Sequence, residues 1–594
     1  MVAKHEEDHL HKIRHSASHV MAQAVLERFP EGKIAIGPPI EDGFYYDFDL
    51  PRPLTPEDLE AVEARMRQII AGDYKFVRRE LSAGEARRLF ADQPYKLELI
   101  DGLEKGLDEY GMSEVEKPVI TTYRHDSFED LCRGPHVEST GQLNPDAIKL
   151  MKISGAYWRG DEHNPMLQRI YGTAWETADQ LEDYLHRLAE AEKRDHRKLG
   201  AQLDLFSVHP EEVGGGLILW HPKGGLIRHL AEDFCRVEHL AHGYELVYTP
   251  HIGRSTLWET SGHLGFFKEN MYAPMDIDGQ EYYLKPMNCP FHIMIYKSSL
   301  RSYRDLPQRY AEWGTVYRYE RGGVLHGLLR VRGFTQDDAH HFCRADQMPE
   351  EIDFVLDFCL HILRSFGFTE FNAYLSTRPE GKAAGEPAQW HDAEAALEAS
   401  LKRAAIPYEI DEGGGAFYGP KIDLKIKDAI GREWQLSTIQ FDFNMGARFG
   451  LTYIGEDGQE HQPYMVHRAL LGSMERFFGV LIEHYGGAFP VWLAPVQGIL
   501  IPIADRHIAY AEQVASRLKD AGLRVEIDAS SDRMGNKIRK AQEQKVPYML
   551  VVGDKEAEAG TVAVRLRTNE NLGPQPVDEF IAMARTAVAE KQQI

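Results

Sequence analysis

With 594 residues, a formal net charge of −24, 43% hydrophobic and 27% charged residues, the chain has the composition of a soluble protein with three or four domains. Its composition argues against a membrane protein, a secreted protein and a disulfide-stapled domain, because no apolar run is long enough for a span, the N-terminus is charged and only five cysteines are present. We therefore expect a cytoplasmic protein that does not bind a membrane. Basic clusters at 193–198 and 297–332 permit nucleic-acid binding despite the acidic total.

The first part of the chain predicts a mixed domain followed by a connector. Up to about Trp175, helical patterns alternate with short strand-like runs such as 43–50. Residues 177–199 then read as one long charged helix with apolar positions at Leu181, Leu185 and Leu188. Because its other faces are polar, this helix suits a linker between domains.

Two further domains follow the linker. In the first, a helix at 226–241 leads into a strand at 244–250, and alternating residues at 416–427 and 434–443 indicate antiparallel strands with one ligand-facing or solvated side. In the last, apolar strands alternate with helical stretches. The predicted strands are 498–503, 524–527 and 548–552, and the predicted helices are 507–521 and 535–543. This order favours a small α/β unit with a largely parallel sheet.

The stretch from Pro307 to His340 is the most informative part of the sequence. Arg318 and Glu320 follow an aromatic-rich run at i and i+2, so on a strand their side chains point the same way. An arginine fork can hold a phosphate while the carboxylate accepts an adenine amino group. This strand–loop–strand resembles motif 2 of the class II aminoacyl-tRNA synthetases. The wider string, from Lys285 to His340, is similar to the bacterial-type threonyl-tRNA synthetase family.

The resemblance covers essentially the whole chain and implies a multidomain α+β and α/β fold. The expected parts are an N-terminal α+β editing domain (1–175), a linker helix (176–204), a class II catalytic domain with an antiparallel sheet (205–490) and a C-terminal α/β anticodon-binding domain (491–594). The helix–strand–proline pattern at 226–250 resembles motif 1 and implies a homodimer. Many bacterial members carry a small extra domain ahead of the editing domain, and His15 comes too early in this sequence for it; catalysis and editing are not expected to depend on it.

The implied activity is that of a threonine–tRNA ligase. It activates L-threonine with ATP to threonyl-adenylate, transfers it to tRNA(Thr) and hydrolyses mischarged seryl-tRNA(Thr). The protein's task in activation is to align the reactants and neutralise phosphate charge. Arg318 is expected on the α-phosphate, and Arg476, in a stretch that resembles motif 3, on the γ-phosphate, with Mg²⁺ accompanying ATP. Either arginine alone would read as a surface ion pair. The other expected ATP-binding residues are Glu320, Arg330, Gln435 and Thr438.

A metal site is expected beside the ATP. Dispersed ligands cannot be identified by spacing, and a lone cysteine is usually just a buried apolar group. The resemblance, however, implies one Zn²⁺ per subunit held by Cys289, His340 and His467, with one coordination position left open. Valine is isosteric with threonine, so a metal that binds the amino group and the hydroxyl discriminates where an apolar pocket cannot. Asp338 is expected to accept the hydroxyl proton. The expected threonine pocket also includes Met287, Gln336, Tyr418 and Gln440, with Lys421 and His263 as catalytic residues and His263 near the terminal ribose of the tRNA.

Serine shares the hydroxyl, and a pocket gains only about 1–3 kcal/mol against a missing methyl group, so accuracy requires a second, hydrolytic site. His15 and His19 lie at i and i+4 on one predicted helix face, and Cys132 and His136 repeat that spacing. From the residues alone a zinc site is the favoured interpretation. The resemblance instead implies an editing site in which these four residues position water and the 3′-terminal adenosine, assisted by Lys96 and Asp130. Whether metal can occupy it stays open.

The C-terminal domain is expected to read the anticodon. A basic run at 533–540 predicts a helix whose N-terminus suits a phosphate, and Arg533, Lys537 and Arg539 are its candidate contacts. Glu556 and Arg567 match family positions near anticodon bases.

Three other functions were weighed against the ligase. A stand-alone tRNA-ester hydrolase or a nonenzymatic RNA-binding regulator would not require the two ATP arginines and the metal ligands, all of which are present. A different class II amino-acid specificity would not require the Cys289, His340 and His467 set with Asp338.

Overall fold

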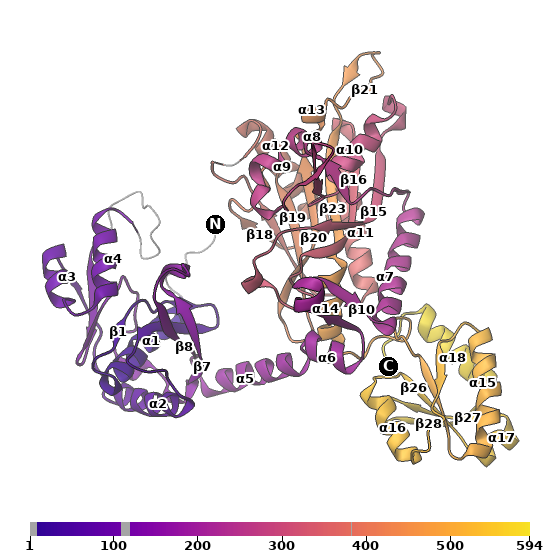
Figure 1. Ribbon diagram of the computed structural model, residues 1–594, viewed down its shortest axis with the longest axis horizontal. Helices are drawn as coiled ribbons and strands as arrows, with labels where there is room; N and C mark the ends of the chain where they lie inside the picture. Colours follow the sequence, from indigo (N-terminus) through magenta and orange to yellow (C-terminus); the bar gives the residue numbers. More distant parts are fainter. Residues whose placement is uncertain (1–8, 108–118, 382) are drawn as a thin grey trace. The chain divides into compact units, whose positions relative to one another are not determined.

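The computed structural model describes residues 9–107, 119–381 and 383–594 (Figure 1). The chain forms two compact units, Met1–Ala189 and Glu190–Ile594. Within the described residues, no helix combines the length and the apolar character that crossing a membrane requires.

The first unit packs helices against a mostly antiparallel sheet. Helix α1 (His9–Arg28) and α2 (Pro56–Ala71) share a core with a sheet in the order β1 (Lys33–Ile34), β3 (Gly43–Asp49), β8 (Met166–Ala174) and β7 (Ile148–Tyr157), with β2 (Pro39–Ile40) paired to β3. The predicted strand at 43–50 is confirmed as β3. A smaller sheet contains β4 (Val77–Glu80), β5 (Thr121–His125) and β6 (Phe128–Leu131), and this unit also contains helices α3 (Ala83–Leu89) and α4 (Pro94–Glu104).

The connector is two helices, so the prediction of one continuous helix is wrong. Helix α5 (Ala178–Lys193) ends before Arg194, and α6 (His196–Gln202) begins two residues later. Asp195 caps α6, because its side chain accepts a hydrogen bond from the Arg197 N–H. A capping aspartate takes extended backbone angles and starts a new helix direction.

The second unit is built on an eight-stranded sheet. Its order is β11 (Glu245–Leu246), β15 (Gln308–Tyr317), β16 (Gly333–Cys343), β23 (Tyr464–Ser473), β20 (Glu433–Asp442), β19 (Lys421–Lys427), β17 (Phe371–Ser376) and β18 (Tyr408–Asp411). The central pairs are antiparallel, as predicted for β19 and β20, and the two outermost pairs are parallel. The strand predicted at 244–250 is limited to β11, although Val247 N–H still bonds to Ala311 O.

Helices on this sheet bury its main core. The helices that contribute to the core are α7 (Pro222–Ala241), α11 (Met348–Ser365), α12 (Pro387–Arg403) and α14 (Met474–Tyr485). The second unit also contains smaller elements: β9 (Phe206–Val208), β10 (Ile218–Trp220), β12 (Ile252–Arg254), β13 (Met275–Ile277), β14 (Gln280–Leu284), α8 (Ser255–Ser261), α9 (His263–Phe266), α10 (Cys289–Lys297), α13 (Met445–Phe449), β21 (Tyr453–Ile454) and β22 (Glu460–His461).

The C-terminal part has a five-stranded mixed sheet. Its order is β25 (Val525–Ile527), β24 (Gly498–Pro502), β26 (Tyr548–Val552), β27 (Thr561–Leu566) and β28 (Asn571–Pro576), with helices α15 (Ile508–Asp520), α16 (Met534–Glu543), α17 (Asp554–Ala559) and α18 (Val577–Ala589). The first three strands are parallel, but β27 and β28 are antiparallel, so the expected largely parallel sheet is only half right. The connections after β26 are too short for parallel crossovers.

Candidate active sites

One cavity of about 220 Å³ collects the residues predicted to bind ATP. It opens between the loop that joins β15 to β16, strand β20 and the start of α14. Its lining includes all six of the predicted residues: Arg318, Glu320, Arg330, Gln435, Thr438 and Arg476. The sequence separates these residues by up to 158 positions, and the antiparallel sheet brings them to one end.

Arg318 and Glu320 lie just beyond the strand, which corrects the prediction that they occupy it. β15 ends at Tyr317, although Arg318 N–H still donates to Arg332 O at 2.9 Å. The Nε of Arg318 donates to Pro286 O at 3.1 Å, and Arg330 forms an ion pair with Glu320 at 3.0 Å. Both members of the expected pair still face one cavity, because the loop continues the hairpin.

Arg476 enters the same cavity from the first turn of α14. Ser473 caps this helix by accepting the Arg476 N–H, and the Arg476 side chain donates from Nε to Leu329 O at 3.2 Å. Burial lowers the pKa of Arg318, and burial together with the nearby Arg330 charge lowers that of Arg476. Partly desolvated cations that crowd one cavity are stabilised by an anion such as a polyphosphate.

Cys289, His340 and His467 converge beside this cavity. One ligand atom from each lies within 4.8 Å of the others, and all three residues are buried. His340 and His467 are paired across β16 and β23, while Cys289 opens α10. Burial and the nearby carboxylates of Asp338 and Asp442 raise the pKa of the Cys289 thiol well above its usual value. The donor set of two imidazoles and one sulfur fits zinc.

Neighbouring groups orient both imidazoles. His340 Nδ1 lies 2.8 Å from His292 Nδ1, and His292 Nε2 lies 3.3 Å from a Glu312 carboxylate oxygen. His467 Nε2 lies 2.8 Å from Asp442 Oδ2. Such partners fix the tautomer and direction of a metal-binding histidine. Sequence reasoning missed His292, Glu312 and Asp442; the only local signal is that His292 follows Cys289 by one helical turn.

The expected threonine residues lie around the same three ligands. Asp338 accepts from Asn288 Nδ2 at 3.1 Å, the Tyr418 ring lies 5.2 Å from the His467 ring, and Gln440 is paired with His467 across β20 and β23. Gln336 lines the 220 Å³ cavity.

The two expected catalytic residues adjoin this pocket. His263 is fully buried, with Nε2 at 3.1 Å from Met287 Sδ, and burial is the main reason its pKa falls to about 3. Lys421 is ion-paired with Asp423 at 2.6 Å. Asp423 also accepts from the Thr438 hydroxyl at 2.7 Å, which ties Lys421 to a residue of the 220 Å³ cavity.

A second cavity, of about 300 Å³, lies in the first unit. Its lining includes five of the six predicted editing residues: His15, His19, Lys96, Asp130 and Cys132. The sixth, His136, joins through sulfur, since Cys132 Sγ lies 3.2 Å from both His15 Nε2 and His136 Nε2. The four histidine and cysteine ligand atoms lie within 4.8 Å of one another.

Three histidines at this cavity have lowered pKa values. Burial is the main cause that lowers the pKa of His15 to about 4 and those of His19 and His136 well below their usual values. Lys96 and Asp130 form a buried ion pair at 2.7 Å. Neutral imidazoles can accept hydrogen bonds from water and so hold it in place for ester hydrolysis. Cys132 and His136 lie in a loop after β6, so the expectation that their spacing is helical is wrong.

The predicted anticodon residues divide into two groups. Arg533 precedes α16, Arg539 is exposed on it and Glu556 lies in α17. Lys537 is 4% exposed and donates to Pro502 O and Asp528 O, and Arg567 donates to Phe489 O, Lys545 O and Ile594 O. Because these donors already serve main-chain carbonyls, the geometry favours a packing role for Lys537 and Arg567.

Three parts of the chain match known domain families. Residues 272–485 match "tRNA synthetase class II core domain (G, H, P, S and T)", residues 497–586 match "Anticodon binding domain", and residues 120–171 match "Threonyl and Alanyl tRNA synthetase second additional domain". The expected fold class is therefore confirmed.

Full-length relatives are also similar. The chain is 54% identical over 588 residues to a threonine–tRNA ligase of Borrelia turicatae, with 99% of each chain covered, and 55% identical over 579 residues to one of Dehalococcoides mccartyi, with 98% and 97% covered. A crystal structure of the RNA binding domain of threonyl-tRNA synthetase from Cryptosporidium parvum aligns with 66% of this chain and 98% of its own, at 40% identity and a TM-score of 0.64. A putative threonyl-tRNA synthetase structure from Aeropyrum pernix aligns with 68% and 98%, at 31% identity and a TM-score of 0.59.

Proposed function

Because the chain belongs to the threonine–tRNA ligase family of class II aminoacyl-tRNA synthetases, we propose that its two cavities divide the work of making and checking threonyl-tRNA. In the second unit, the threonine carboxylate attacks the α-phosphate of ATP and displaces pyrophosphate. The adenylate then passes its acyl group to tRNA(Thr) and releases AMP. In the first unit, seryl esters on the same tRNA are hydrolysed. The observation that carries this proposal is that the ATP residues and a neighbouring His₂Cys cluster are both built on the one antiparallel sheet.

The charges of the cavity residues and the elements they come from support a contact with ATP for each of them. Arg318 and Arg476 approach the 220 Å³ cavity from opposite elements, so one can bind the α-phosphate while the other binds the γ-phosphate. Glu320 accepts the adenine amino group, and the polar edge of β20 (Gln435 and Thr438) faces the nucleotide. Arg330 supplies further positive charge. Mg²⁺ accompanies the phosphates, as class II chemistry requires for charge neutralisation.

We assign Cys289, His340 and His467 as ligands of one Zn²⁺ per subunit. Bound there, zinc would supply a Lewis acid for the amino and hydroxyl groups of threonine, because three protein ligands leave its coordination incomplete. Asp338 accepts the hydroxyl proton, and Met287, Gln336, Tyr418 and Gln440 enclose the amino acid. Valine has the same amino group but lacks the hydroxyl, so Asp338 and the metal would each lose that contact. Lys421 and His263 border this pocket and act as catalytic residues, with His263 near the terminal ribose of the tRNA.

In the first unit, His15, His19, Cys132 and His136 position water against the ester, and the Lys96–Asp130 pair holds the cluster and the terminal adenosine. The neutral imidazoles can hold this water by accepting its hydrogen bonds.

We also propose a homodimer, a cytoplasmic location and anticodon contacts. Helix α7 exposes the apolar side chains of Val237 and Leu240, each about half exposed, which suits an interface. The cytoplasm supplies tRNA and keeps cysteines reduced, and no disulfide joins the five cysteines, all of which the structure describes. The 491–594 domain binds the anticodon through Arg533, Arg539 and Glu556. The other parts of the chain are the editing domain (1–175), the linker (176–204) and the catalytic domain (205–490).

Amino-acid-dependent pyrophosphate exchange tests the proposal. Threonine should support rapid exchange, serine weaker exchange and valine almost none, since valine lacks the hydroxyl group that the metal and Asp338 would bind. C289A should lose both its zinc and threonine-dependent exchange. Full exchange in metal-free protein, or equal exchange with valine, would contradict the assignment.

A further inference from the structure

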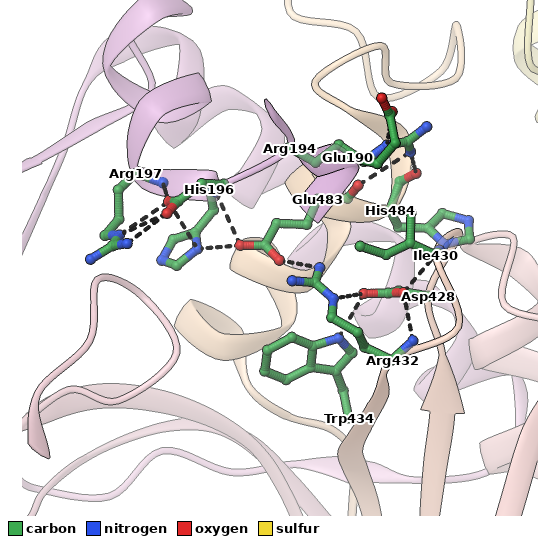
Figure 2. Close-up of polar contacts among 11 residues, drawn as sticks. Glu190, Arg194, His196, Arg197, Asp428, Ile430, Arg432, Trp434, Glu483 and His484 are labelled. Atoms are coloured by element: carbon green, nitrogen blue, oxygen red, sulfur yellow. Dashed lines mark hydrogen bonds and ion pairs between the residues drawn. The ribbon is translucent and has the colours of Figure 1, made fainter. Parts of the chain in front are cut away.

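The imidazole of His196 occupies the point where the linker meets two elements of the ATP cavity. His196 begins α6, and its side chain is fully buried. Figure 2 shows its ring pointing toward Glu483, which comes from the last turn of α14. His196 Nδ1 lies 2.6 Å from Glu483 Oε1, and Nε2 lies 3.0 Å from the main-chain nitrogen of Leu328. One side chain therefore joins the linker, α14 and the loop between β15 and β16.

These two bonds fix the ring as one neutral tautomer. The Leu328 N–H can only donate, so His196 Nε2 must be the acceptor and Nδ1 must carry the proton. That proton is donated to the Glu483 carboxylate, which also accepts the main-chain N–H of His196 at 3.1 Å. Although burial opposes ionisation of Glu483, its bonds with His196 and the nearby Arg432 charge lower its pKa. Both ring nitrogens are thus bound, and the ring cannot rotate without breaking both contacts.

The loop is shaped to receive this ring. Gly327, which precedes Leu328, has a positive φ of 48°, and a Cβ there would lie 2.1 Å from His196 Nε2. Only glycine lets the loop approach the imidazole this closely. Leu329, which follows, accepts the Arg476 Nε–H through its carbonyl at 3.2 Å, and Leu329 and Arg330 line the ATP cavity. The position of Leu328 therefore sets the position of an acceptor for the phosphate-binding Arg476.

Glu483 extends the same contact to strand β20. Its second oxygen is ion-paired with Arg432, whose Nε donates to Asp428 Oδ2 at 2.7 Å. Trp434 Nε1 donates to the same Asp428 oxygen at 3.0 Å, and this group is labelled in Figure 2. Trp434 immediately precedes Gln435 on β20. The His196–Glu483 pair is consequently linked by hydrogen bonds and ion pairs to three elements of the ATP cavity: the loop between β15 and β16, helix α14 and strand β20.

A cation does not fit this cluster, although Asp195, His196 and Glu483 lie close together. Asp195 is bound by the Arg197 guanidinium, Glu483 by Arg432, and both nitrogens of His196 are used. The lone pairs that a metal would need are already committed to protein donors.

We propose that His196, oriented by Glu483, is a positioning residue for ATP: it holds the 322–332 loop in the form that places Leu329 and Arg476 for phosphate binding. The inference rests on the proposed assignment of the 220 Å³ cavity to ATP. Because His196 does not touch the substrate, it acts on ATP affinity through the loop and not on the amino-acid pocket.

Two amide substitutions, each of which mimics one ring nitrogen of His196, distinguish this role from simple packing. In H196Q the amide reaches as far as Nε2 and can accept the Leu328 N–H, whereas in H196N it reaches only as far as Nδ1 and can donate to Glu483. Each variant leaves one buried partner unsatisfied, so both lose stability in thermal unfolding. In threonine-dependent pyrophosphate exchange, H196N should raise the KM for ATP about tenfold, the factor that corresponds to one lost hydrogen bond. H196Q should keep a nearly normal KM for ATP, and the KM for threonine should stay unchanged in both.

G327A provides an independent variant that does not alter His196. Its Cβ displaces the imidazole from Leu328 and should also raise the KM for ATP, while H186N, an exposed histidine of α5, should behave as the unaltered protein. Equal KM values for ATP in H196N and H196Q, or an unchanged KM in G327A, would overturn the inference. R476A separates this inference from the ATP assignment: if R476A uses ATP normally, the assignment itself fails, and if R476A is defective while H196N is not, only the positioning role fails.

Discussion

His340 and His292 face each other through their Nδ1 atoms, which lie 2.8 Å apart in the buried centre of the second unit. One of the two nitrogens must carry the proton, so the rings hold complementary tautomers. Glu312 lies 3.3 Å from the far nitrogen of His292 and accepts a second bond from the Thr249 hydroxyl. The chain Glu312–His292–His340 has the arrangement that orients a metal-binding imidazole and increases its basicity.

H292F should weaken zinc binding about 10- to 100-fold, because it removes the bond that orients His340 while it keeps the shape of the ring. The measurement is the zinc retained after dialysis against chelators of graded strength. H391F is the matched control, since His391 is 84% exposed on α12. Equal zinc retention in the two variants would show that His292 does not support the metal.

R318A and R476A should each lower kcat/KM for ATP in pyrophosphate exchange by at least about a hundredfold, since each removes a partly desolvated cation from the phosphates. The lysine variants R318K and R476K keep the charge but lose the fork, so they should fall between alanine and the unaltered protein. Kinetics unchanged by either alanine substitution would place the ATP outside this cavity.

The proposed homodimer predicts a sedimenting species of twice 67.7 kDa at micromolar concentration. V237E/L240E should favour the monomer, because it places two charges on an exposed apolar part of α7. K223E, also on α7 but at its N-terminus, tests whether added charge alone disrupts the dimer. A monomer in the unaltered protein would refute the proposal.

The order of the predicted elements along the chain and the local hydrophobic pattern were sufficient to predict most of the architecture. Regular alternation identified β3, β19 and β20, and the order of apolar strands and helices identified the C-terminal α/β part. The linker break at Asp195 was missed because a cap overrides an otherwise continuous helical pattern. The C-terminal sheet was misjudged because β27 and β28 were not among the predicted strands, although β27 alternates buried and half-buried residues.

The sites were predictable only where residues belong to a recognisable string. The ligands Cys289, His340 and His467 are dispersed, so only resemblance links them. The one local sign of a partner is that His292 follows Cys289 by one helical turn, and nothing in the spacing points to Glu312. Lys537 and Arg567 donate to main-chain carbonyl groups of distant residues, and no local sequence pattern reveals those acceptors. His196 illustrates the same limit, since its partners lie 132 and 287 residues away.

His125 should make the first unit sensitive to acid. It is 1% exposed, and within the described residues neither ring nitrogen has a hydrogen-bond partner. Burial lowers its pKa to about 4 from 6.5. Above pH 6.5 the residue is neutral in both states. As the pH falls from 6.5 toward 4, only the unfolded state gains the proton, so stability declines by up to about 3 kcal/mol.

H125F removes this proton-binding group and keeps a ring of similar shape. Its unfolding temperature should therefore depend less on pH between 6.5 and 4 than that of the unaltered protein. H163A, which removes an exposed histidine from the same unit, should keep the original dependence. Parallel pH curves for H125F and the unaltered protein would contradict the role given to burial.

The two cavities should be separable by mutation. H15A/H19A removes two histidines of the 300 Å³ cavity in the first unit and leaves the zinc ligands untouched. Threonine charging should stay near normal, while seryl-tRNA(Thr) should accumulate. The reason is that a synthetic pocket rejects a smaller hydroxyl amino acid by only about 1–3 kcal/mol, so accuracy depends on later cleavage of the ester.

The assay incubates each variant with serine, ATP and threonine-accepting tRNA and follows the Ser-tRNA that forms. H163A is the matched control and should show no accumulation, because His163 is exposed and outside the cavity lining. If the histidines merely packed α1, the double variant would lose its fold or behave normally, and neither result produces mischarging. Absence of Ser-tRNA while threonine charging proceeds would therefore refute the editing assignment.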